Sequence, residues 1–190
     1  MKTVNILICG VGGQGVLLAG DIIAEAAIAA GLDAKKSEVH GMAQRGGSVV
    51  SHVRYGDKVN SPLIRAGEAD AILSFEEMET ARYLDFLKPG GTVIINRQQV
   101  MPMTVATGKA EYPADIVADI KKQIAKTILC DGLKLSEQAG SAKTINIVLL
   151  GALAKQLDLP KDTWITTISA RVPPKTVAMN VKAFELGYGN

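Results

Sequence analysis

Cysteine is scarce in this chain of 190 residues, which contains two: Cys9 and Cys130, each inside an apolar run. Because free cysteine is often buried, both are interpreted as core thiols rather than ligands. Two thiols cannot complete a four-cysteine iron–sulfur cluster or zinc site. The two histidines, His40 and His52, have no regularly spaced carboxylate or thiol beside them. We therefore expect this chain to hold no metal.

An excess of charge of one sign is also missing, because 21 Lys and Arg residues stand against 19 Asp and Glu residues. Nucleic acid and anionic lipid attract clustered positive charge, so neither is an expected partner. The apolar stretch after Gly15 is interrupted by Asp21 and Glu25, and it falls short of the roughly 20 apolar residues of a membrane span. The N-terminus shows no apolar segment that ends in a small-residue cleavage site. These features predict a cytoplasmic protein with no membrane partner.

Several catalytic motifs are absent as well. The sequence has no G-x-S-x-G elbow, no G-x-x-x-x-G-K-[ST] phosphate loop, no H-E-x-x-H and no C-x-x-C. Each of these patterns places the groups that a particular chemistry needs at a fixed spacing. Their absence counts against a self-sufficient hydrolase, nucleoside triphosphatase or metalloenzyme.

What is present is an alternation of strand-like and helix-like segments over a length typical of one domain, here residues 1–190. Strands are expected at residues 3–9, 33–39, 48–55, 71–75, 92–96 and 127–130, and helices at 16–30, 76–87, 113–126, 142–157 and 175–186. Residues 60–64 are expected to run back as a hairpin partner of the third strand. The order predicts an α/β fold with a mostly parallel sheet flanked by helices on both faces, a Rossmann-like start and a hairpin insertion.

The stretch GVGGQG, residues 10–15, lies between the first expected strand and helix. It matches G-x-G-x-x-G, and a helix start offers free N–H groups and a positive dipole end to a phosphate. Glu38, near the end of the second expected strand, takes the place of the ribose-binding acid of dinucleotide enzymes. The candidate cofactor contacts are Gly12, Gly13, Gln14 and Gly15. Alternatively, the glycines serve only a tight turn, or the loop meets another subunit.

A second polar constellation lies in SEVHGMAQRGGSVVSHVR. His40, Gln44, Arg45, Gly46 and Gly47 are candidate substrate or interface residues, because glycine lets the backbone approach a ligand closely and arginine can fork onto phosphate or carboxylate. No helper base for the histidine is identifiable, so no catalytic residue is assigned. The alternative is a solvated loop whose arginine pairs with an acid.

Acidic residues follow the fourth expected strand in the sequence EEME, residues 76–79. Acids in the first turn of a helix usually complement its dipole, so these are expected to be structural. Residues 97–113 show little periodicity and are interpreted as a long connection or an extended arm.

Five stretches together resemble a known family: ICGVGGQGVLLAGDIIAEAA, SEVHGMAQRGGSVVSHVRYG, GEADAILSFEEMETARYLDFLKPGGTVIIN, GKAEYP and NVKAFELGYG. The chain resembles the small, gamma-type subunits of the 2-oxoacid:ferredoxin oxidoreductases, in particular the beta subunits of indolepyruvate ferredoxin oxidoreductase. G-x-G-G-Q-G marks the wider superfamily, whereas HGMAQRGG points to the arylpyruvate branch. The similarity spans nearly the whole chain.

The resemblance implies a reaction in which an aryl 2-oxoacid and coenzyme A give an acyl-CoA, carbon dioxide and reduced ferredoxin. Thiamine diphosphate and [4Fe-4S] clusters are then expected in a large partner subunit, which agrees with the missing G-D-G…N-N thiamine motif here. This chain would bind no cofactor alone, be inactive alone, form a hetero-oligomer with the large subunit, reach ferredoxin through the complex and help to hold coenzyme A.

Two other readings of the sequence stay open. A stand-alone NAD- or flavin-dependent oxidoreductase would use Gly10, Gly12, Gly15 and Glu38. A purely structural assembly factor would need residues 40–47 for contact only.

Overall fold

The computed structural model describes residues 2–40 and 47–190, with the side chain of His40 left out. Its strands form one sheet in the order β2-β3-β1-β4-β5-β6. The strands are β1 (Val4–Val11), β2 (Asp33–His40), β3 (Ser48–Gly56), β4 (Ala69–Ser74), β5 (Leu87–Asn96) and β6 (Thr127–Cys130). The pairs β1–β4, β4–β5 and β5–β6 are parallel. Strand β3 is antiparallel to both of its neighbours, β1 and β2. The sheet is therefore mostly parallel, as expected.

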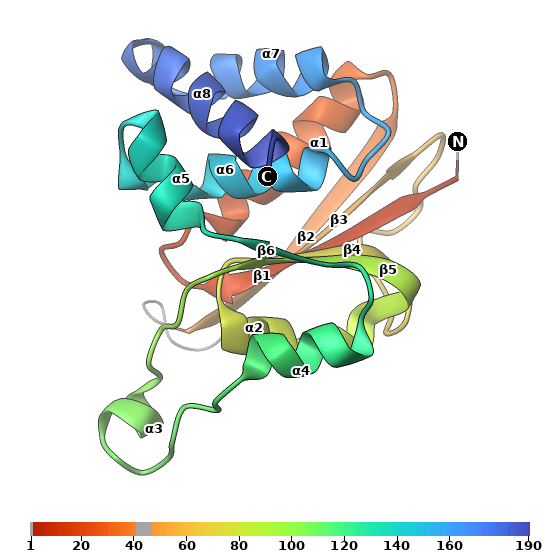
Figure 1. Ribbon diagram of the computed structural model, residues 1–190. Helices are drawn as coiled ribbons and strands as arrows, with labels where there is room; N and C mark the ends of the chain where they lie inside the picture. The colour runs from red at the N-terminus through yellow and green to blue at the C-terminus, as the bar shows by residue number, and fades with distance from the viewer. Residues whose placement is uncertain (1, 41–46) are drawn as a thin grey trace.

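Helices cover both faces of this sheet (Figure 1). They are α1 (Val16–Ala29), α2 (Glu77–Arg82), α3 (Met103–Ala106), α4 (Ile116–Gln123), α5 (Gly132–Ala139), α6 (Ile145–Ala154), α7 (Lys161–Arg171) and α8 (Val177–Tyr188), with 3-10 turns η1 (Leu84–Phe86), η2 (Ala142–Thr144) and η3 (Pro174–Thr176). One face carries α1 and α5 to α8, and the other carries α2 and α4. No helix in the described ranges has the length and apolar character needed to cross a bilayer.

The two faces of β1 show why the sheet needs two helical layers. Ile6 and Ile8 are fully buried in the cluster that contains α1, α6 and α8. Leu7 and Cys9 are fully buried in the opposite cluster, which contains Ile116 of α4. Since side chains alternate along a strand, an unbroken apolar run predicts burial on both faces. The expected α/β fold class is confirmed.

The expected strand at residues 60–64 is wrong, because that segment is irregular. Both edges of β3 are already occupied, since it pairs with β1 from Val4↔Tyr55 to Val11↔Ser48 and with β2 from Asp33↔Gly56 to His40↔Val49. Pro62 also lacks the N–H group that a paired strand would donate. The hairpin consists of β2 and β3 instead.

Several helix boundaries also differ from expectation. The helix expected at 76–87 ends at Arg82, and after η1 the chain enters β5 at Leu87, where it pairs with Ala69. Helices α5 and α7 were not expected. The α5 helix begins at Gly132 and is capped by Asp131, whose side chain accepts a hydrogen bond from the Lys134 N–H at 3.1 Å.

Candidate site at the carboxyl edge of the sheet

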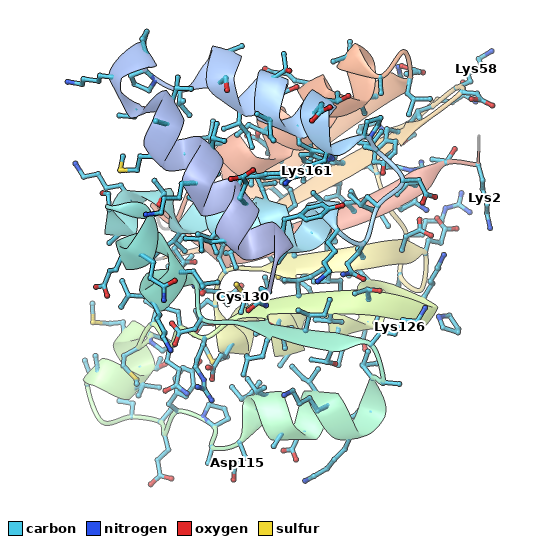
Figure 2. The ribbon with its side chains drawn as sticks, turned by 45° about the horizontal axis from the view of Figure 1, so that its top comes forward. Lys2, Lys58, Asp115, Lys126, Cys130 and Lys161 are labelled. Carbon is cyan, nitrogen blue, oxygen red and sulfur yellow. The ribbon has the colours of Figure 1, made fainter. Side chains whose placement is uncertain are left out.

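The GVGGQG turn lies where β1 ends and α1 begins. This is the carboxyl edge of the parallel strands, opposite the edge at which Lys2, Lys58 and Lys126 project in Figure 2. Gly13 and Gly15 have φ values of 98° and 90°, a region that side chains strongly disfavour. These two glycines are required by the backbone of the turn itself.

Gln14 closes the turn with its side chain. Its Oε1 accepts the Val11 N–H at 2.7 Å, and its Nε2 donates to the Phe75 carbonyl at 3.3 Å and to Gln98 Oε1 at 3.2 Å. Asn96, almost fully buried, donates from Nδ2 to the same two oxygens at 3.1 and 3.0 Å. Gln14, Asn96 and Gln98 form what we call the amide network. It joins the carboxyl ends of β1, β4 and β5.

The first turn of α1 is capped by backbone alone. Gly15 is its N-cap and provides no side-chain hydrogen bond. The Ala19 N–H donates to the Gly15 carbonyl at 3.0 Å, so the N–H groups of Val16, Leu17 and Leu18 precede that bond and have no carbonyl within their own helix. With the positive end of the helix dipole, these groups favour an anion.

Glu38 does not take the position that dinucleotide binding needs. Because β3 lies between β2 and β1, Glu38 pairs in the sheet with Ser51 and is one strand removed from the end of β1. Its carboxylate forms an ion pair with Lys36, which also contacts Asp21 of α1. In the Rossmann arrangement the second strand neighbours the first. The geometry therefore disfavours the stand-alone NAD-dependent alternative.

The second polar segment of the sequence, residues 40–47, contacts the GVGGQG turn through the backbone of Gly47. The Gly12 N–H donates to the Gly47 carbonyl at 2.9 Å, so the two polar segments of the sequence meet. His40 ends β2, and its side chain, with Gln44, Arg45 and Gly46, lies outside the described residues. The contributions of these four residues stay predictions.

The acids at residues 76–79 are more buried than the sequence indicated. Glu76 is fully buried, and its carboxylate accepts the Glu79 N–H at 2.8 Å, the Val100 N–H at 3.1 Å and the Tyr112 hydroxyl at 2.6 Å. The first of these bonds caps α2, in agreement with a structural role. The other two hold both ends of the segment 97–113. Burial, followed by the hydrogen bond to Glu76, raises the pKa of Tyr112.

Glu79 is a second buried acid of the EEME segment. It is 3% exposed, accepts a hydrogen bond from the Ser48 hydroxyl, and accepts one from Arg82 Nε at 3.2 Å. The signal available in the sequence was the position of EEME directly after a buried strand, at the edge where functional groups of parallel sheets gather. Ser48 comes from a distant segment, whereas Arg82 lies one helical turn along α2.

Comparison with known proteins adds what geometry alone does not provide. A family model described as pyruvate ferredoxin/flavodoxin oxidoreductase matches residues 5–189. The chain belongs to this family. It is 42% identical over 194 aligned residues to the indolepyruvate oxidoreductase subunit IorB of Thermococcus kodakarensis, covering 98% of this chain and 95% of that protein.

Solved structures of the pyruvate ferredoxin/flavodoxin oxidoreductase family share the fold. The gamma subunit of a keto/oxoacid ferredoxin oxidoreductase from Geobacter sulfurreducens is 28% identical, with a TM-score of 0.73 over 98% of this chain and 96% of that chain. A 2-oxoglutarate:ferredoxin oxidoreductase from Magnetococcus marinus, with 2-oxoglutarate, coenzyme A and succinyl-CoA bound, is 22% identical. Its TM-score is 0.74 over all of this chain and 31% of that longer chain.

The thiols of this family member are poor metal ligands. Burial raises the pKa of both Cys9 and Cys130 to about 12, so both are protonated at neutral pH, whereas a metal binds the thiolate. In Figure 2 Cys130 lies inside the molecule at the end of β6. No group of three or more His, Cys, Asp or Glu side chains that could hold a metal occurs in the part of the chain that the structure describes. These residues do not fit an iron–sulfur cluster.

Proposed function

We propose that this chain is the small, non-thiamine subunit of a 2-oxoacid:ferredoxin oxidoreductase that acts on indolepyruvate or a related arylpyruvate. The observation that carries the proposal is the 42% identity to an indolepyruvate oxidoreductase subunit across 98% of the chain. The amide network and the buried acids support it, because they are committed to internal hydrogen bonds at the edge where an independent enzyme would keep catalytic groups.

In the proposed reaction, the oxoacid loses carbon dioxide, its acyl carbon forms a thioester bond to coenzyme A, and two electrons pass to ferredoxin. Thiamine diphosphate stabilises the carbanion left by decarboxylation, and iron–sulfur clusters carry the electrons one at a time. We assign both groups to a large partner subunit, since the protonated thiols here do not fit a cluster.

The contribution of this chain is to dock on the large subunit with the carboxyl edge of its sheet and to help hold coenzyme A. The phosphates of coenzyme A suit the first-turn N–H groups of α1 after Gly15. Gly12, Gly13 and Gln14 provide backbone for the same contact or for the subunit interface. His40 and the segment 44–47 are assigned to the substrate or subunit face by the family resemblance.

The test is an activity assay of the chain alone, of the large subunit alone and of both together, with indolepyruvate, coenzyme A and ferredoxin. We expect ferredoxin reduction only in the combined sample. A Glu38→Gln variant is the matched control, because the NAD-dependent alternative requires that acid whereas the proposed function does not. NAD-dependent turnover by the lone chain that is lost in this variant would replace the proposal with that alternative.

A further inference from the structure

A cavity at the amino edge of the sheet is lined by side chains of both charges. Its volume is about 480 Å³, which lies in the range of small-molecule sites. The lining residues are Arg54, Ser61, Leu63, Arg65 and Glu68. Arg54 belongs to β3 and is paired in the sheet with Asn5 at the start of β1. The cavity therefore lies at the edge from which Lys2 and Lys58 project in Figure 2, opposite the GVGGQG turn.

The guanidinium group of Arg54 is fixed by the chain around it. Nε donates to Asn5 Oδ1 at 2.8 Å, and Nη1 donates to the carbonyls of Ser61 and Leu63 at 2.9 and 3.2 Å. A guanidinium has five N–H donors in a rigid plane. These three bonds leave both donors of Nη2 without a partner in the described ranges. Because the group is already ordered, binding an anion there costs little conformational entropy.

The same cavity holds a second cation and a single acid. Arg65 and Glu68 are exposed, and neither side chain forms an ion pair or a hydrogen bond with any residue that the structure describes. They belong to one turn before β4, in which the Glu68 N–H donates to the Arg65 carbonyl at 3.2 Å. Two positive charges around one cavity favour an anion between them.

The mixture of charges selects among anions. Guanidinium donors fork onto a carboxylate or a phosphate. The carboxylate of Glu68, however, repels a ligand with a second negative charge and attracts an ammonium group. Leu63 is 55% exposed and adds an apolar wall. A molecule with one carboxylate, one ammonium group and an apolar side chain matches all of these features, and this is the composition of an apolar α-amino acid.

We infer that the cavity at the amino edge binds an α-amino acid with an apolar side chain. Arg54 and Arg65 hold its carboxylate. Glu68 accepts a hydrogen bond from its ammonium group, and Leu63 contacts its side chain. The inference goes beyond the proposed function and does not depend on it, because the site uses residues of this chain alone and needs neither coenzyme A nor a partner subunit.

The experiment measures binding of three probes to the full chain by calorimetry. Phenylalanine, phenylpyruvate and phenylethylamine share one aryl group, but phenylpyruvate lacks the ammonium group and phenylethylamine lacks the carboxylate. We expect the wild type to bind phenylalanine, and to bind each of the other two at least about 10-fold more weakly, since each loses a charge-assisted contact. Absence of saturable phenylalanine binding, or equal affinity for either of the other probes, would overturn the inference.

Arg65→Ala and Glu68→Gln test the two ends of the ligand. Neither side chain has a bond in the described ranges, so both variants should keep the midpoint of thermal unfolding of the wild type. Each should weaken phenylalanine binding about 10-fold. E68Q should bind phenylpyruvate at least as well as the wild type does, because a repulsive charge is removed. Unchanged phenylalanine affinity in either variant would contradict the site.

Lys126→Ala is the matched control for charge. Lys126 is exposed and projects at the same edge in Figure 2, and its side chain has no described hydrogen bond or ion pair. The variant should bind phenylalanine as the wild type does. Equal weakening in K126A and R65A would reduce the effect to net charge and overturn the inference. These measurements use the isolated chain, so their outcome is independent of whether the complex with the large subunit reduces ferredoxin.

Discussion

Single side chains at the carboxyl edge connect segments that lie far apart in the sequence. Gln14 joins the GVGGQG turn to Phe75 and Gln98, and Glu76 joins α2 to both ends of the segment 97–113. Each is polar and placed among apolar strands, so each must satisfy several partners at once. Gln14, which the sequence predicts as a candidate cofactor contact, therefore also holds the turn together through internal hydrogen bonds.

Replacing Glu76 with glutamine tests that role. The substitution keeps the shape of the side chain but replaces one acceptor oxygen by a donor, which then faces N–H or O–H donors. We expect the free energy of unfolding in urea to fall by about 1–3 kcal/mol. Tyr112→Phe, which deletes one of the three bonds, should cost less. Equal stability of E76Q and wild type would show that the carboxylate does not hold these segments.

His52 gives the fold a pH dependence whose sign can be worked out. Its Nδ1 accepts the Ile64 N–H at 3.2 Å, so the ring is neutral, and burial lowers its pKa from the ordinary value of 6.5. The unfolded state therefore takes up a proton first as the pH falls. Stability is fully present above pH 6.5 and is lost as the pH decreases toward the lowered pKa.

The measurement for His52 is urea unfolding at several pH values between about 7.5 and 5, compared with His52→Asn. Asparagine offers an acceptor oxygen but does not titrate in this range. We expect the wild type to lose more stability than the variant over that interval. Parallel pH profiles for the two proteins would contradict the assignment.

At the scale of elements, the layer on one face depends on a close approach of α6 and α8. A Cβ on Gly187 would lie 1.9 Å from the Val148 carbonyl oxygen, and one on Gly151 would lie 2.1 Å from the Phe184 carbonyl oxygen. Both obstacles are backbone atoms of the facing helix. The small residues that the sequence shows in α6 serve this packing within the chain.

Gly187→Ala should therefore lower stability by about 3 kcal/mol or more, because a backbone carbonyl cannot move aside without separating the two helices. Gly189→Ala is the matched control on the same helix end, since its Cβ would be 3.5 Å from its nearest neighbour, the Glu185 carbonyl oxygen. That change should stay within roughly 0.5 kcal/mol. Thermal unfolding of both variants checks the prediction, and a tolerated G187A would contradict the described contact.

At the scale of the whole molecule, the apolar runs predicted the sheet well. The strand expected at 127–130 coincides with β6, and the strand expected at 48–55 corresponds to β3. What the local pattern could not supply is pairing between distant segments. The insertion of β3 between β1 and β2 removes Glu38 from the site. The sequence analysis did not predict short polar helices such as α5, because their apolar stripe is narrow.

The central claim is that the decarboxylating and electron-carrying groups belong to a larger partner. The most direct measurement is the content of iron, sulfide and thiamine diphosphate in the purified chain and in the reconstituted complex. The account predicts none of the three in the isolated chain and all of them in the complex, together with indolepyruvate-dependent ferredoxin reduction. Stoichiometric thiamine diphosphate or an iron–sulfur cluster held by the isolated chain would contradict it.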